Sequence, residues 1–274
     1  MSSTDAQTES QDSLGAQLVT AVVEAEVGKA RTLLAQWKAT GKPWPSGPEA
    51  KPLLFLAIEG REEAHPAMID LLLENGAQVA TRGPLGMMAL HWAAANGYAE
   101  RTEQILKRRP PLEAVDEYGR TALLVAHGDA AEKLLAVGAN LRATDKDGMG
   151  ALHYAAQAGP AHLGLLFNAG LTDVNARSKA GLTPLHVAAV EGNESAAQWL
   201  LDRGAKVDAA LTADFEYLPY KMAPGYGNEM RLKRGSTPLR LASLQHGTTK
   251  WSSGRHRAVL ELLKGRAGKG WFGR

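Results

Sequence analysis

The sequence contains no cysteine among its 274 residues. It therefore has no disulfide framework, no thiolate metal ligand and no cysteine nucleophile. No apolar run reaches the roughly 18 residues that a membrane-spanning helix requires, so we expect no membrane span. Residues 1–12 lack both a basic segment and an apolar segment. We therefore expect no secretory signal and a cytoplasmic location, unless secretion uses a signal-independent route.

Several motifs of catalysis and phosphate binding are also missing. The sequence has no H-E-x-x-H zinc motif, no G-x-S-x-G nucleophile turn and no G-x-x-x-x-G-K-[S/T] phosphate loop. We therefore expect a protein that is not an enzyme and that uses neither a cofactor nor a metal.

One four-residue phrase, by contrast, occurs five times. It reads Met-Ala-Leu-His, Thr-Ala-Leu-Leu, Gly-Ala-Leu-His, Thr-Pro-Leu-His and Thr-Pro-Leu-Arg at residues 88–91, 121–124, 150–153, 183–186 and 237–240. Successive occurrences are 33, 29, 33 and 54 residues apart. A period of 33 built on this phrase is typical of ankyrin repeats, and the chain resembles that family.

The resemblance is fullest over residues 183–205. Thr183 is a natural helix cap, and Pro184 suits the first helical position because its missing N–H has no helical partner there. Gly192 and Gly204 stand where the two helices of the repeat must end. The resemblance implies an all-α solenoid of about seven helix-turn-helix repeats joined by hairpin fingers, used as a scaffold for protein binding.

The repeat boundaries follow from the spacing. We expect a disordered polar leader (1–13), repeats at 14–48, 49–82, 83–115, 116–144, 145–177, 178–210 and 232–266, an insertion at 211–231 and a tail at 267–274. The fourth repeat is about four residues short, which is roughly one helical turn. Its first helix is therefore expected to be stunted near residues 126–128.

Three histidines occupy the fourth place of the phrase, at His91, His153 and His186. A shared metal site is an alternative, but ligands one repeat apart are too distant for metal bonds of about 2 Å. The family resemblance implies a structural role, in which each histidine bonds across to the next finger. Trp92 and Tyr154 follow two of these histidines and are expected to pack between repeats.

The family resemblance also implies which residues meet a partner. Partners of ankyrin repeats usually contact the finger tips and the exposed side of each first helix. On this chain the tip positions are Met87, Tyr118, Arg120, Lys146, Met149, Lys179 and Leu182, and the first-helix positions are Asn96, Gln157 and Glu191. Four of the tip residues are apolar or aromatic, which indicates an adhesive ridge, with ordinary surface scatter as the alternative.

The insertion is unusually aromatic. It contains Phe215, Tyr217, Tyr220 and Tyr226, together with Lys221. Exposing the apolar surface of aromatic rings to water is unfavourable, so we expect these side chains to pack against other protein surface. Two alternatives stay open: the rings fold back on the array, or they anchor a partner.

Charge is distributed unevenly along the chain. From Arg231 onward there are eleven Lys or Arg and one acidic residue, whereas the rest carries 20 basic and 28 acidic residues. A basic end of this kind can attract an acidic protein surface, can bind nucleic acid, or can serve only as a solvated cap, and nucleic acid is the weakest of these alternatives. We expect a monomer that binds one protein partner. Its composition resembles bacterial ankyrin proteins, which implies two alternatives: an immunity protein that inhibits a toxin, or an effector that binds a host protein.

Overall fold

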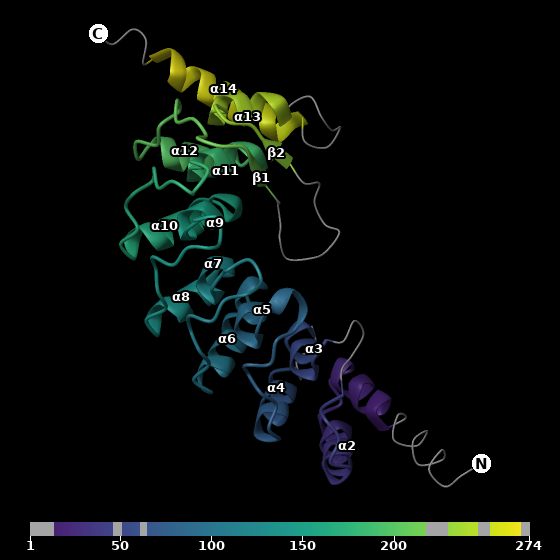
Figure 1. Cartoon of the computed structure of the whole chain (residues 1–274). Coiled ribbons are helices and arrows are strands. Elements are labelled where there is room, and N and C mark those ends of the chain that lie inside the picture. Colours follow the sequence, from purple (N-terminus) through teal and green to yellow (C-terminus); the bar gives the residue numbers. More distant parts are fainter. Residues whose placement is uncertain (1–13, 46–50, 61–64, 218–229, 246–252, 270–274) are drawn as a thin grey trace, which may run out of the picture. The chain divides into compact units, whose positions relative to one another are not determined.

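The computed structural model describes residues 14–45, 51–60, 65–217, 230–245 and 253–269. The chain divides into two compact parts, Met1–Ala139 and Asn140–Arg274, which we call the N-terminal part and the C-terminal part. Each part is built of helix pairs joined by extended loops (Figure 1). The all-α repeat fold expected from the sequence is confirmed, apart from one two-stranded ribbon.

The N-terminal part contains four helix pairs. They consist of a helix at residues 14–23 with α2 (Val27–Ala39), α3 (Leu53–Glu59) with α4 (His65–Glu74), α5 (Ala89–Ala95) with α6 (Ala99–Leu106), and α7 (Ala122–Val125) with α8 (Asp129–Ala136). The single turn η2 (Pro84–Gly86) lies in one of the fingers. Helix α7 has four residues, and this short first helix is the one that the 29-residue interval predicts.

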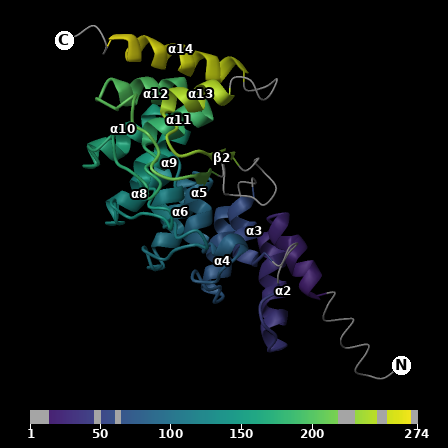
Figure 2. The ribbon, with the colours of Figure 1, turned by 45° about the horizontal axis from the view of Figure 1, so that its top comes forward.

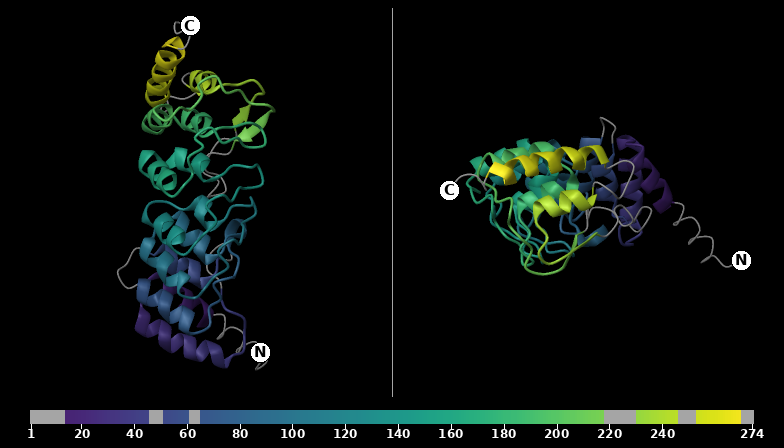
Figure 3. Two further views of the ribbon diagram at one scale, coloured as in Figure 1. Left: turned by 90° about the vertical axis from the view of Figure 1, so that its left-hand side faces the viewer. Right: turned by 90° about the horizontal axis from the view of Figure 1, so that it is seen from above.

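The C-terminal part contains three helix pairs and the ribbon. The pairs are α9 (Ala151–Ala158) with α10 (Pro160–Asn168), α11 (Pro184–Glu191) with α12 (Glu194–Leu201), and α13 (Pro238–Gln245) with α14 (Ser253–Lys269). Helices α11 to α14 lie side by side in both Figure 1 and Figure 2. Figure 3 (left) shows the helices of this part on one side and its fingers with the ribbon on the other.

Helix boundaries follow the local chemistry of the repeat. Thr183 adopts extended backbone angles before Pro184, and Gly192 ends α11 in the left-handed conformation with φ of 67°. Second helices end in the same way, as at Gly204 with φ of 86°. In the third repeat Arg109 takes this place with φ of 49°, a conformation that costs a non-glycine residue about 1–2 kcal/mol.

Small side chains let the helices of each repeat pack closely. Ala188 and Ala189 of α11 are fully buried, beside Leu185 and Leu200 from the same repeat. Burying one leucine side chain removes it from water and stabilises the fold by about 1.5–3 kcal/mol. The core therefore forms within and between neighbouring repeats, as expected for a solenoid.

The insertion extends the finger between the sixth and seventh repeats. Its strands β1 (Phe215–Tyr217) and β2 (Met230–Leu232) pair antiparallel, with Glu216 opposite Arg231. Side chains alternate along both strands, so that Tyr217 and Leu232 are buried while Glu216 and Arg231 are exposed. The ribbon therefore has one face toward the protein and one face toward solvent.

Replacing Leu185 by Ala is expected to lower the free energy of unfolding by about 2–5 kcal/mol, because Leu185 is fully buried and truncation leaves a cavity. Leu244→Ala is the matched control, since Leu244 is 55% exposed on α13. Urea denaturation of both variants measures the difference. Equal losses in the two variants would contradict the packing described for α11.

Candidate protein-binding surface

Each histidine of the phrase bonds its own helix to the next finger. The backbone N–H groups of Met88, Gly150 and Thr183 donate to Nδ1 of His91, His153 and His186 at 3.3, 3.1 and 3.1 Å. The Nε2 atoms lie 3.1, 3.0 and 3.2 Å from the carbonyl oxygens of Arg120, Leu182 and Ser236 in the following fingers. The structural role expected for these histidines is confirmed.

This geometry requires neutral imidazole rings. Because Nδ1 accepts a hydrogen bond, the single ring proton must be on Nε2, where it can be donated to the carbonyl. Burial lowers the pKa of all three histidines and brings that of His186 to about 4. The three rings are therefore neutral at pH 7, as the bonds need.

The expected apolar ridge on the finger tips is wrong. Met87, Met149 and Leu182 are at most 2% exposed and belong to the core. The physical reason lies in the finger turn: the N–H of Met149 donates to the Asp145 carboxylate at 2.8 Å, and the N–H of Leu182 donates to the Ser178 hydroxyl at 3.1 Å. The turn thus closes at these residues and directs their side chains into the core.

Arg120 is also buried, although the sequence places it on a tip. It occupies the position of Met149 and Leu182 in the fourth repeat and is 2% exposed. Its guanidinium forms an ion pair with Asp116, with Nε and Nη2 at 2.7 and 2.6 Å from Oδ2. The ring of half-buried Tyr118 lies 4.8 Å from the guanidinium carbon. Arg120 therefore has a structural role in its finger.

Two predicted tip residues do remain exposed, and they lie in neighbouring fingers of the C-terminal part. Lys146 and Lys179 are both exposed. The Lys179 backbone N–H donates to the Asp147 carbonyl at 2.8 Å, and its Nζ donates to the Lys146 carbonyl at 2.6 Å. In the next finger, the Thr212 N–H donates to the Ala180 carbonyl at 2.9 Å. Backbone hydrogen bonds thus hold three consecutive fingers in register.

The ribbon is attached to the first helices of the C-terminal part through Tyr217. This side chain is 2% exposed; its hydroxyl donates to Glu191 Oε1 on α11 at 2.6 Å and accepts from Gln157 Nε2 on α9 at 2.5 Å. Gln157 and Glu191 were expected to face a partner and are instead half-buried beneath Tyr217. For Tyr217, packing on the array is therefore the correct alternative.

The remaining residues that the sequence predicts to bind a partner, or to pack between repeats, lie in different environments. Phe215 is half-buried on β1. Asn96 is exposed at the C-terminal cap of α5, where its Nδ2 donates to the Trp92 carbonyl at 2.7 Å. Tyr220, Lys221 and Tyr226 lie outside the described residues. Trp92 packs against Phe55 with a ring-centre distance of 5.6 Å, which confirms the expected packing between repeats.

Of the exposed residues of this surface, Glu216 was missed from the sequence, whereas Arg231 was considered only as the start of the basic C-terminal end. Glu216 and Arg231 face each other on the solvent side of the ribbon. The alternation of apolar and charged residues in Phe-Glu-Tyr and Met-Arg-Leu is the signal that could have found them. At the base of the ribbon, Asp214 accepts hydrogen bonds from Lys233 Nζ at 3.1 Å and the Arg234 N–H at 2.9 Å.

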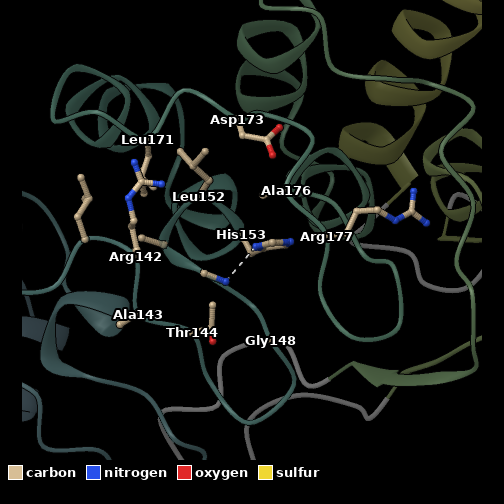
Figure 4. Close-up of a pocket in the computed structure, with 13 residues that line it drawn as sticks. Arg142, Ala143, Thr144, Gly148, Leu152, His153, Leu171, Asp173, Ala176 and Arg177 are labelled. Atoms are coloured by element: carbon tan, nitrogen blue, oxygen red, sulfur yellow. Dashed lines mark hydrogen bonds between the residues drawn. The ribbon is translucent and has the colours of Figure 1, made fainter.

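Behind the fingers lies a small pocket with a volume of about 220 Å³ (Figure 4). Its floor is largely apolar, including Leu152, Leu171 and Ala176, while Arg142 and Asp173 stand on its rim. His153 forms part of the wall, and Figure 4 marks its hydrogen bond from the Gly150 N–H. Both ring nitrogens of His153 already form hydrogen bonds within the protein, so the ring lines the pocket without offering a ligand a hydrogen bond.

Within the described ranges, no three or more His, Asp or Glu side chains are grouped so that they could hold a metal ion. In that same part of the chain, no helix combines the length and the apolar character needed to cross a membrane.

Comparison with known proteins identifies the class of fold. The sequence model of the family described as ankyrin repeats (3 copies) matches residues 54–145 and 125–210, which is more than half of the chain. The solved ankyrin repeat domain of Bcl-3, an IkappaB protein, superposes with a TM-score of 0.58 and 23% identity, over 90% of this chain and 97% of that domain. The chain belongs to the ankyrin-repeat family.

Two curated relatives show how far the similarity extends. The rice (Oryza sativa subsp. japonica) probable E3 ubiquitin-protein ligase XBOS33 is 33% identical over 208 residues, covering 71% of this chain and 39% of the rice protein. The mouse (Mus musculus) NF-kappa-B inhibitor delta is 30% identical over 192 residues, covering 67% of this chain and 54% of the mouse protein. The chain thus spans about half or less of the length of each relative.

These relatives come from a plant and a mammal, and they give no support to the expected bacterial origin or to toxin inhibition. The ankyrin fold is in general a non-enzymatic scaffold that binds proteins, and the ligase name belongs to the longer rice protein. The repeat array of this chain is accordingly a protein-binding scaffold.

Replacing Arg120 by Ala is expected to lower the free energy of unfolding by about 3–5 kcal/mol, because it leaves the Asp116 carboxylate buried without its partner. The double variant Arg120→Leu with Asp116→Ser copies Leu182 and Ser178 of the sixth repeat and should recover most of that loss. Thermal or urea unfolding measures both. A double variant as unstable as Arg120→Ala would contradict this account.

The Glu191 carboxyl gives a pH dependence of known sign. Burial is the largest influence and raises its pKa above the usual value, although the Tyr217 hydrogen bond opposes the rise. The folded state then binds more protons than the unfolded state between the two pKa values, so this group stabilises the fold at low pH and loses that contribution as pH rises. Unfolding of wild type and Glu191→Gln should therefore show the variant gaining relative stability from pH 4 upward. A constant difference would refute the assignment.

Proposed function

We propose that the chain binds a protein partner through a surface in its C-terminal part, which we call the finger surface. It consists of the exposed tip residues Lys146 and Lys179 and the solvent face of the ribbon with Glu216 and Arg231. The observation that carries this proposal is the rigidity of the surface. Backbone hydrogen bonds join the three fingers, and Tyr217 fixes the extended finger to α9 and α11.

A rigid surface favours binding because less conformational entropy is lost when the partner docks. Buried Tyr217 therefore contributes by holding the ribbon in place, while the charged side chains on the solvent face of the ribbon can contact a partner. The exposed cations Lys146, Lys179, Arg231 and Lys233 outnumber the exposed anions Glu216 and Asp214. Asp214 pairs with Lys233 at 3.1 Å and with Arg231 at 3.6 Å, whereas Lys146 and Lys179 form no ion pair among the described residues. The partner that fits best presents carboxylates to this surface, and such charge complementarity mainly accelerates association.

Site-specific photo-crosslinking tests this surface directly. A photoreactive amino acid in place of Lys179 or Arg231 should capture the same protein from cells that express the chain, whereas the same group in place of exposed Ser195 on α12 should not. Ser195 is a suitable control because it is exposed and belongs to α12. Figure 3 (left) shows the helices of this part on the side opposite its fingers.

The captured partner is then purified and its association measured with wild type and with the double variant Lys146→Glu, Lys179→Glu. We expect about a tenfold slower association for the variant at low salt, with a smaller difference at high salt, because the charges are exposed and screened. Equal capture at position 195, or equal association rates, would remove the finger surface as the binding site.

A further inference from the structure

Two successive junctions between repeats differ at one position. At the junction between the fifth and sixth repeats, the Asn175 side chain bridges the backbone: its Nδ2 donates to the Gly204 carbonyl at 3.0 Å, and its Oδ1 accepts from the Lys206 N–H at 2.9 Å. The carboxamide thus supplies one donor and one acceptor and fills the space between two loops.

One repeat earlier, Arg142 stands in the place of Asn175, 33 residues before it. The following loop, Gly170-Leu171-Thr172-Asp173, is one residue longer than its counterpart Gly204-Ala205-Lys206. Within the described residues, the Gly170 carbonyl and the Asp173 N–H form no hydrogen bond. The 220 Å³ pocket opens at this junction, with Arg142 and Asp173 on its rim.

The lining carries charges of both signs, from exposed Arg142 and exposed Asp173. A second arginine of the lining, Arg177, points away from Arg142 and donates to the Ala210 carbonyl at 2.5 Å. Among the described residues, the Arg142 guanidinium has no hydrogen bond or ion pair, and the Asp173 carboxylate accepts only the Asn175 N–H at 3.0 Å. Figure 4 shows the two side chains on opposite sides of the apolar floor. Both side chains are exposed to solvent, so a ligand that covers the pocket removes water from both charged groups and binds best when it offers each of them a hydrogen-bond partner.

The charges of Arg142 and Asp173 favour some ligand groups over others. A carboxylate would suit Arg142 but would be repelled by Asp173, and an ammonium group would meet the reverse problem. An aliphatic side chain would leave both charges unpaired. A carboxamide is neutral and dipolar, with an oxygen that can accept from Arg142 and an N–H₂ that can donate to Asp173. The volume is below the roughly 300–1,000 Å³ typical of cofactor sites and suits one side chain.

We propose that this pocket binds the carboxamide side chain of a glutamine or asparagine on the partner protein. The proposal rests on the protein-binding function above and adds a specificity site to it. The chain itself provides the precedent, since Asn175 fills the equivalent place at the next junction with the same chemical group. At the fifth repeat, the missing carboxamide is supplied by the partner.

The pocket can be tested without knowing the partner. The ¹⁵N-labelled full chain is titrated with N-acetyl-glutamine amide, and amide shifts are followed by NMR. The expected result is saturable shifts at Thr144, Asp173 and Ala176 with a Kd in the millimolar range, and at least threefold weaker binding of the matched glutamate and leucine probes. No shifts at these residues, or tighter binding of the glutamate or the leucine probe, would overturn the proposal.

A substitution taken from the neighbouring repeat gives a second test. Arg142→Asn should let the new carboxamide bridge to the Gly170 and Asp173 backbone, slow the hydrogen exchange of the Asp173 N–H and abolish the response to the glutamine probe. Arg142→Lys is the matched control, which retains the cation and should retain binding within about threefold. An Arg142→Asn variant that still binds the probe would refute the pocket. Because no partner is present, failure of the crosslinking experiment would leave this result unaffected, and the reverse also holds.

Discussion

The structure depends on one interaction, the histidine bridge from the start of a first helix to the next finger. In His153 and His186 a single neutral imidazole accepts from its own helix terminus and donates to a carbonyl of the following finger. Burial keeps the ring neutral by lowering its pKa. Where the histidine is present, the helix pair is thereby fixed to the finger beyond it, so the position of that finger follows from the packing of the helices.

Where the repeat departs from its pattern, other interactions take over. The fourth repeat has Leu124 in place of the histidine and a first helix of four residues. Its finger is closed by the buried pair of Arg120 and Asp116, at positions where the sixth repeat has Leu182 and Ser178. Burying the two charges of such a pair carries a desolvation cost. Removing one member destabilises the fold further, because the other charge is left buried without its partner. The finger therefore keeps its shape through electrostatics instead of apolar packing.

The features on which the functional proposals rest are also departures from the repeat. The insertion lengthens one finger into a ribbon, and Tyr217 fixes it by bonding to Glu191 and Gln157 on two different helices. A pocket lies beside Arg142, whereas Asn175, at the equivalent position one repeat later, bonds to the Gly204 carbonyl. A regular array provides rigidity, and the two proposals above assign partner recognition to its irregular positions.

The sequence by itself determined the family, the helix pairs and the shortened α7, because a periodic pattern places equivalent residues in equivalent surroundings. The resemblance to that family further implied the role of His91, His153 and His186. The sequence misplaced Met87, Met149, Leu182 and Arg120, since periodicity locates a residue in a finger but does not say which way its side chain points. Only the tertiary structure decided that Tyr217 packs inward and that Arg142 borders a pocket. Both outcomes depend on contacts between segments far apart in the sequence, such as the 60 residues between Gln157 and Tyr217.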